Sequence, residues 1–158
     1  MMTVIDRETR KVVKHRVGQD FVLAGKATFT IQTPEGTHYT FRVDRKKASG
    51  SYPVAYFVSQ LTGSDNESDY TYLGKLDPYT GQVIATRATN GREKSYAFAL
   101  LNRVLARVWG DDHAAFEQFG FKLLHVGKCG RCGRTLTVPA SIESGIGPEC
   151  AKFTKMWK

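Results

Sequence analysis

The sequence predicts an α+β fold, in which an antiparallel β-meander packs one long helix on one face, because two periodicities follow each other along the chain. Between residues 21 and 87, apolar and polar residues alternate over short runs separated by turn residues, as in half-buried strands. From Lys94 to Trp109 the apolar residues recur with a period of about 3.6, as in an amphipathic helix. All three cysteines follow, and their spacing predicts a C-terminal zinc ribbon.

The first strands of the meander are expected to form a hairpin. Residues 28–33 and 39–43 both alternate, and Pro34-Glu35-Gly36 between them favours a turn. A basic loop over residues 46–51 follows. Three further strands are expected over Val54–Leu61, Tyr70–Leu76 and Val83–Arg87, of which the last two are joined by a turn over Asp77–Gly81.

The long helix has one apolar stripe, which we expect to pack on the sheet. Arg103 and Arg107 lie four residues apart on another face, and Gly110 ends the helix. A short second helix is expected from Asp111 or Asp112 through Phe119. The stripe consists of Ala97, Leu100, Leu101, Val104, Leu105 and Val108.

Three regions can be separated by these patterns. Residues 1–16 are expected to form a basic N-terminal arm, of which residues 7–16 are weakly helical or extended. Residues 17–119 contain the β-meander and the helices, and residues 120–158 form the zinc-ribbon module. In that module, residues 121–126 are expected as a strand that leads into the metal site, and a terminal helix begins near Pro148.

The metal site is predicted from residue types and spacing. Cys129 and Cys132 form a CxxC pair, whose two thiolates can converge on one ion at a tight turn, and Cys150 supplies a third. A structural Zn²⁺ needs four ligands, and three cysteines with one histidine are a common set. His125 fits the fourth position best, because it stands just before the CxxC pair, and His113 is the alternative.

Two other interpretations of the cysteines are less favoured. A redox CxxC motif normally opens a helix, whereas Gly130 and Gly133 around this pair predict a loop. A disulfide framework is disfavoured by the odd number of cysteines and by the lack of a signal peptide. Since the sequence also has no apolar run of about 20 residues that could cross a membrane, we expect a cytoplasmic protein without a membrane partner.

The positive charge is unevenly distributed. The formal net charge is +8, and residues 17–119 are neutral, so the excess lies in the N-terminal arm, at +3, and in residues 120–158, at +5. A zinc ion with three thiolates would leave the tail at about +4. Segregated positive charge favours nucleic acid or another polyanion as partner, although it could also serve only solubility.

The segment from Cys129 to Cys150 resembles an uncharacterised zinc-ribbon-like domain of bacteriophage and other mobile-element proteins. The similarity lies in the CGRCGR knuckle, in the Gly-Ile-Gly-Pro sequence before the last cysteine, and in the upstream histidine. Residues 21–30 and 65–74 also resemble such proteins. It implies a phage or plasmid origin, hence the cytoplasm of a bacterial host, and the ligand set His125, Cys129, Cys132 and Cys150. It implies no activity.

Two further clusters allow more than one interpretation. The acidic run with Asp65, Glu67 and Asp69 could bind Mg²⁺ for phosphodiester hydrolysis, but its composition is also that of a solvated loop between strands. Aromatic and basic residues interleave in the meander, which suits base stacking, although one aromatic row must belong to the core. Tyr70 and Tyr72 are expected to share one face of a strand.

The sequence therefore predicts a small basic zinc-containing nucleic-acid-binding protein. In it the cations of the zinc module would contact phosphates, with Arg131 held out by the zinc-fixed turn; they are Lys128, Arg131, Arg134, Lys152 and Lys155. One alternative is a phage module that binds or inhibits a host enzyme or defence complex. The other is a metal-dependent nuclease. An enzyme is not favoured, because no catalytic Ser-His-Asp or Cys-His arrangement is evident and a closed zinc site has no open position.

Overall fold

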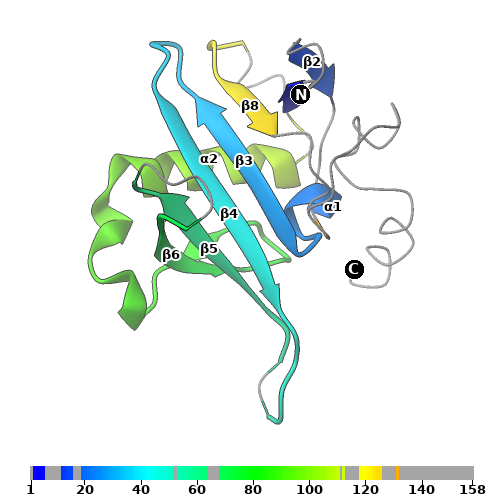
Figure 1. Cartoon of the computed structure of the whole chain (residues 1–158), viewed down its shortest axis with the longest axis vertical. Helices are drawn as coiled ribbons and strands as arrows, with labels where there is room; N and C mark the ends of the chain where they lie inside the picture. The colour runs from blue at the N-terminus through cyan, green and yellow to red at the C-terminus, as the bar shows by residue number, and fades with distance from the viewer. Residues whose placement is uncertain are drawn as a thin grey trace.

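An eight-stranded sheet is the centre of the fold. The computed structural model of the chain describes residues 2–5, 12–15, 19–51, 53–63, 68–110, 112, 118–125 and 131. The strands are β1 (Met2–Ile5), β2 (Val12–His15), β3 (Lys26–Gln32), β4 (His38–Lys46), β5 (Ala55–Leu61), β6 (Tyr70–Leu76), β7 (Val83–Ile84) and β8 (Lys122–His125). Helix α2 (Tyr96–Trp109) crosses one face of this sheet, and the short helix α1 (Gln19–Val22) precedes β3 (Figure 1).

The predicted meander is confirmed and is part of a larger sheet. Its strand order is β2-β1-β8-β3-β4-β5-β6-β7, in which β3 to β7 are consecutive antiparallel neighbours. The six strands from β8 to β7 are all antiparallel, because β8 returns to pair with β3. The N-terminal hairpin of β1 and β2 adds to the free edge of β8, and β1 runs parallel to β8. The arm is therefore extended in both described parts and belongs to the sheet.

The two faces of the sheet differ in burial, as the alternation predicts. Ala27, Phe29 and Ile31 of β3 are buried, whereas the residues between them are half-buried. Phe29 pairs with Phe41 of β4, and their ring centroids lie 5.9 Å apart. The fold thus has one closed face, which makes the core, and one face turned away from α2, here called the open face.

A β-bulge in β6 changes which residues reach the open face. Ser59 of β5 pairs with Tyr72, but the preceding residue Val58 pairs with Gly74, so Leu73 is the extra residue. Leu73 is buried in the core with 1% of its surface exposed. Because the bulge reverses the alternation, Tyr72 and Lys75 lie on the open face while Leu76 lies in the core.

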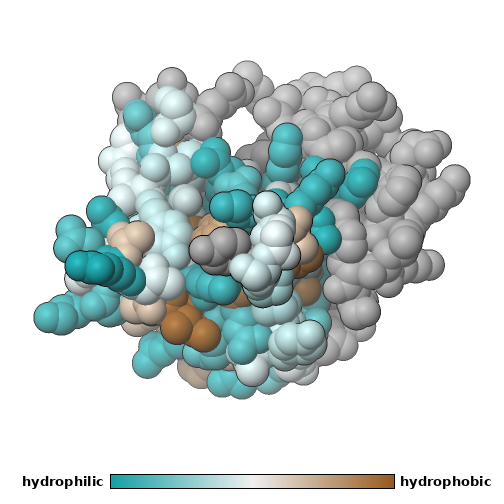
Figure 2. All heavy atoms as spheres, turned by 90° about the horizontal axis from the view of Figure 1, so that it is seen from below, coloured by the Kyte–Doolittle hydropathy of each residue, from teal (hydrophilic) through white to brown (hydrophobic). Residues whose placement is uncertain are grey.

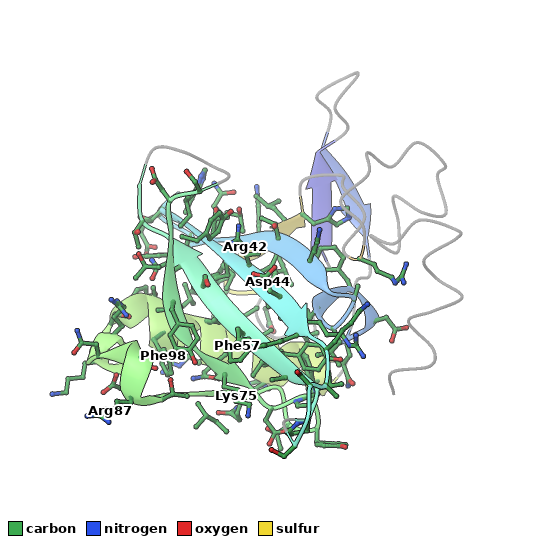
Figure 3. All side chains as sticks on the ribbon, turned by 60° about the horizontal axis from the view of Figure 1, so that its bottom comes forward. Arg42, Asp44, Phe57, Lys75, Arg87 and Phe98 are labelled. Atoms are coloured by element: carbon green, nitrogen blue, oxygen red, sulfur yellow. The ribbon has the colours of Figure 1, made fainter. Side chains whose placement is uncertain are left out.

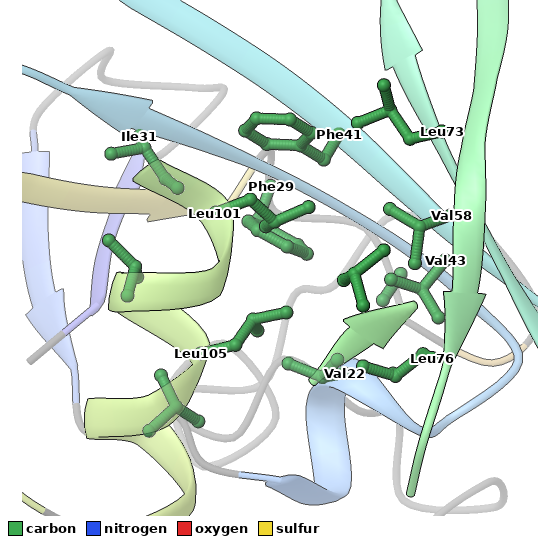
Figure 4. Close-up of a cluster of buried hydrophobic side chains, with 14 of the residues drawn as sticks. Val22, Phe29, Ile31, Phe41, Val43, Val58, Leu73, Leu76, Leu101 and Leu105 are labelled. Atoms are coloured by element: carbon green, nitrogen blue, oxygen red, sulfur yellow. The ribbon is translucent and has the colours of Figure 1, made fainter. Parts of the chain in front are cut away.

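Helix α2 closes the core and begins two residues later than its predicted start. The Ser95 hydroxyl accepts a hydrogen bond from the Phe98 N–H at 3.2 Å, which caps the first turn, and Gly110 follows the last. All six residues of the predicted stripe are buried, together with Phe98. Leu101 and Leu105 meet Phe29, Phe41, Val43 and other sheet residues in one cluster (Figure 4). Full burial of one such leucine contributes about 1.5–3 kcal/mol.

The side chain of Asn102 ties α2 to the last strand of the meander. Its Oδ1 accepts from the Val83 N–H at 2.7 Å, and its Nδ2 donates to the Val83 carbonyl at 3.3 Å. A helix residue therefore supplies the hydrogen bonds that the edge strand β7 lacks on its outer side. Strand β7 is shorter than the predicted Val83–Arg87, because a 3-10 turn over Arg87–Thr89 (η1) begins after Thr86.

The predicted second helix and most of the zinc module lie outside the described residues. Only Asp112, Gln118 and Phe119 of the expected helix are described, and none of them is helical. The terminal helix expected near Pro148 and the three cysteines also fall outside this set. In the described part of the chain, no helix combines the length and the apolar character that a membrane span requires.

Candidate metal centre and nucleic-acid interface

His125 is the one predicted zinc ligand that the structure describes, and it is fixed by the sheet. It is the last residue of β8, where it pairs with Phe29 of β3 on one side and with Val4 of β1 on the other. Its side chain is only 1% exposed, and its ring centroid lies 5.2 Å from that of Phe21 in α1. Neighbouring strands thus fix the backbone of His125, and an aromatic ring packs near its imidazole, as suits a metal ligand.

The other predicted ligands lie outside the described residues. The CxxC pair begins at Cys129, four residues after His125, and Cys150 follows later. Within the ranges that the structure describes, no three histidine, cysteine or carboxylate side chains come together as a metal site. His38 lies on β4 and is exposed, so it is placed differently from the buried His125.

Among the predicted phosphate contacts, only Arg131 is described. Its side chain is half-buried and its Nε atom is shielded from solvent, whereas the sequence suggested a side chain held out from the knuckle. The other four, Lys128, Arg134, Lys152 and Lys155, fall outside the described residues.

The two basic regions of the chain meet at one edge of the sheet. Strand β1 lies in the N-terminal arm, and β8 opens the region 120–158. The two strands pair in parallel, with Met2 opposite Leu123 and Val4 opposite His125. No pattern in the sequence predicts this pairing, because both strands have only four residues and lie more than a hundred residues apart.

The open face carries a second cluster of candidate binding residues, which we call the aromatic–basic face. Two rows of residues cross strands β4, β5 and β6 there. The first row is Arg42, Ser59 and Tyr72, and the second is Asp44, Phe57 and Lys75. Tyr70, opposite Leu61, continues the face on β6. Figure 3 shows Arg42, Asp44, Phe57 and Lys75 following one another across these strands, with Arg87 on the loop beyond them.

A cation–π contact lies on this face, between β4 and the first residue of β6. The guanidinium carbon of Arg42 is 4.2 Å from the centroid of the Tyr70 ring, and the Arg42 Nε donates to Asp44 Oδ2 at 3.0 Å. Burial of the Tyr70 hydroxyl raises its pKa above the ordinary value; Arg42 opposes that shift and Asp44 adds to it. The phenol is therefore neutral at physiological pH.

A ring pair lies beside this contact. The centroids of Phe57 and Tyr72 are 6.1 Å apart, with their planes tilted by 50°. The Tyr72 hydroxyl lies 3.0 Å from the Thr86 Oγ1, and the Arg92 Nη1 donates to the Tyr72 carbonyl at 3.1 Å. The loop after β7 thus holds the position of Tyr72.

Positive charge prevails around the rings. On the open face of β4 to β6 there are the cations Arg42, Lys46 and Lys75 and one carboxylate, Asp44, which pairs with Arg42. Lys46, Lys75 and the nearby Arg87 are exposed. The coloured part of the surface in Figure 2, seen from below, is mostly hydrophilic, with smaller apolar areas between the polar groups.

The structure separates the interleaved aromatics, as the sequence could not. Tyr39, Phe41 and Tyr56 belong to the core or pack against it, whereas Phe57, Tyr70 and Tyr72 lie on the open face. Tyr70 and Tyr72 share this face as predicted. Phe57 lies on the open face because it pairs with Asp44. The register between the strands, which sets this pairing, could not be predicted from the sequence.

The acidic loop is described only at its end. Asp65 and Glu67 lie outside the described residues. Asp69 is half-buried, and its backbone carbonyl accepts from the Thr62 N–H at 2.8 Å, which closes the connection between β5 and β6.

Comparison with known proteins gives one match, to the C-terminal region. The model of a family of unknown function (DUF6011) matches residues 124–152, a segment that begins in β8 and includes His125 and all three cysteines. No curated protein and no solved structure matches the chain significantly. The match thus shows similarity to an uncharacterised family over this segment.

Proposed function

We propose that the chain is a small basic zinc-containing nucleic-acid-binding protein that acts in the cytoplasm of a bacterial host. The observation that carries this proposal is the parallel pairing of β1 with β8, which joins two basic regions at one edge of the sheet. Residues 1–16 and 120–158 hold the whole positive excess of the chain, +3 and +5. Concentrated positive charge attracts the phosphate backbone and releases its counterions.

The zinc ion belongs to this proposal as a structural group. His125, Cys129, Cys132 and Cys150 would hold it, and the fixed position of His125 on β8 suits a ligand that anchors the tail to the sheet. Zinc binding would order the segment that carries Arg131 and Arg134, since binding energy is folding energy in such modules. An origin in a phage or mobile element rests on the sequence resemblance alone.

The test is a binding titration over a range of salt concentrations. Zinc-loaded full-length protein is titrated against labelled single- and double-stranded DNA and RNA, beside a variant with Arg131→Ala and Arg134→Ala and a second with Lys11→Gln and Lys14→Gln. The proposal predicts that affinity falls with salt and that both variants bind more weakly. If no nucleic acid binds even at about 50 mM salt, the proposal is wrong, and the basic edge would instead face an acidic protein of the host.

A further inference from the structure

We propose that the aromatic–basic face binds the bases of single-stranded nucleic acid by stacking. Phe57 and Tyr72 would supply the rings, and the exposed lysines at the margin, Lys46 and Lys75, would contact phosphates. This inference rests on the proposed function and adds to it a substrate class and a second site, on strands β4 to β6.

The rings on this face have the placement that stacking needs. Phe57, Tyr70 and Tyr72 are only half-buried and lie on the side opposite α2. Phe57 and Tyr72 lie within the β5–β6 pairing, and Tyr70 lies at its end. Helix α2 buries its apolar residues against the other face, so among the described elements no helix covers these rings (Figures 1 and 3). Stacking of a base on such a ring removes apolar surface from water and tolerates any base.

The charges on the same face complement a phosphate backbone. Lys75 stands beside Phe57 in the second row, and Lys46 lies further along the open side of β4. The single carboxylate that β4 to β6 place here, Asp44, is engaged by Arg42 at 3.0 Å. Cations next to aromatic rings are the combination with which proteins bind single strands without reading their sequence.

The face is also arranged before any ligand arrives. Arg42 reaches over Ser59 to lie on the Tyr70 ring, and Tyr72 is held through its contacts with Thr86 and Arg92. Side chains that are already fixed lose little conformational entropy on binding. Ser59, the residue of β5 between Arg42 and Tyr72 in the first row, has a small side chain.

A single strand fits this face better than a duplex or an acidic protein. In a duplex the base faces are stacked inside the helix, and proteins reach only base edges through the grooves. An acidic peptide could form ion pairs with the lysines, but it has no planar groups that would stack on the rings. Unpaired bases offer planar faces and a charged backbone together.

The experiment compares ring replacements in the zinc-loaded full-length chain. The probes are fluorescent oligo(dT) and oligo(rU) of about 20 nucleotides, which spans one to several binding sites of this kind, a duplex of equal length, and a polyglutamate peptide. Phe57→Leu and Tyr72→Leu keep apolar side chains on the strands and remove the rings. Tyr79→Leu is the matched control, because Tyr79 is 90% exposed on the turn between β6 and β7, beside the Pro78 carbonyl that accepts from Trp109.

The expected result is a loss of single-strand affinity of about five-fold or more for each ring replacement, with Tyr79→Leu unchanged. Tyr72→Phe, which keeps the ring and loses only the hydroxyl, should weaken binding less than Tyr72→Leu does. The exposed Lys75 gives a variant that does not endanger folding: Lys75→Gln should reduce the slope of log affinity against log salt by about 0.7.

Other results would overturn the inference, and they differ in whether the proposed function still holds. If both leucine variants and Lys75→Gln bind as the wild type does, while Arg131→Ala with Arg134→Ala binds weakly, the site lies on the tail only. Tighter binding of the duplex than of the single strand would likewise overturn the inference that the open face binds single strands. Binding of polyglutamate alone, with neither nucleic acid, would overturn this inference and the proposed function together.

Discussion

The guanidinium of Arg42 lies 4.2 Å from the centre of the Tyr70 ring, although the two residues stand on strands that are separated by β5. A cation–π contact of this kind contributes about 0.5–1 kcal/mol at an exposed site and more when it is shielded. Asp44 fixes the guanidinium from the other side through a 3.0 Å contact. Three side chains from two strands thus form one fixed group on the aromatic–basic face.

The pKa of Tyr70 should respond to both charged neighbours with opposite signs. Burial raises this pKa most, Arg42 lowers it because a cation stabilises the phenolate, and Asp44 raises it. Arg42→Gln should therefore raise the pKa of Tyr70, and Asp44→Asn should lower it. Titration followed by NMR of tyrosine labelled with ¹³C at the ζ carbon measures both; a fall in Arg42→Gln would contradict the contact.

The same shift sets the sign of a pH effect on stability. The folded-state pKa lies above the ordinary value of about 10, so the folded protein keeps a proton that the unfolded chain loses. The contribution of Tyr70 to stability is fully present below that pH and is lost as pH rises through the folded pKa. Tyr70→Phe should show a smaller decline in the free energy of unfolding in this alkaline range than the wild type.

Gly81 should tolerate a methyl group less well than Gly36, although both have positive φ angles. Gly81 has φ +76°, and a Cβ there would approach the Trp109 ring to 2.6 Å, whereas Gly36 has φ +88° and open space around it. Gly36→Ala should cost about 1–2 kcal/mol from backbone strain alone. Gly81→Ala should cost more, because the indole that donates to the Pro78 carbonyl must also shift. If urea unfolding shows the same loss in the free energy of unfolding for both variants, the Trp109 ring shifts without cost.

Asn102 should contribute to stability through its two hydrogen bonds to Val83. Asn102→Ala leaves the N–H and carbonyl of Val83 without these partners, and we expect a loss of about 1–3 kcal/mol in the free energy of unfolding. Arg103→Ala, at the neighbouring exposed position, should change stability by less than about 0.5 kcal/mol. Thermal unfolding of the two variants side by side measures the difference, and an Asn102→Ala protein as stable as Arg103→Ala would contradict the role of the amide.

The zinc prediction can be tested against a neighbouring core residue. Native mass spectrometry should show one zinc per chain, and His125→Ala should lose that zinc to a chelator concentration that the wild type withstands. Leu123→Ala serves as the control, because Leu123 is 2% exposed on the same strand but has no ligand atom. It should be less stable by about 2–5 kcal/mol and still retain zinc. Full retention in His125→Ala would exclude His125 and favour His113 as the fourth ligand.

The sequence predicted the local elements well, since their signals are local. Helix α2 follows from six apolar residues at helical spacing and from Gly110 at its end, whereas its cap Ser95 was not predicted. Strands β3 to β6 lie where alternating residues were found, and β8 lies within residues 121–126. The turn at Asp77–Gly81 is also confirmed by the hydrogen bond from the Gly81 N–H to the Asp77 carbonyl.

Relationships between distant strands could not be predicted in this way. The pairing of β1 with β8 joins short segments from opposite ends of the chain, and no pattern in either segment predicts which strand it pairs with. The bulge at Leu73 shifts the register between β5 and β6, which decides that Lys75 joins Tyr72 on the open face. The contact of Arg42 with Tyr70 depends on the order of three strands. The spacing predicts the ligand types of a zinc site, which stays a prediction, but it did not predict the burial of His125.

Ultraviolet cross-linking tests the central claim, nucleic-acid binding, most directly. The zinc-loaded full-length chain is irradiated with a labelled single-stranded oligonucleotide of about 20 residues at about 50 mM salt, and the modified peptides are identified by mass spectrometry. We expect adducts on the aromatic–basic face, at Phe57, Tyr70 or Tyr72, and within residues 120–158. If the oligonucleotide forms no adduct with the chain under these conditions, while a known single-strand-binding protein is labelled in parallel, the claim is wrong.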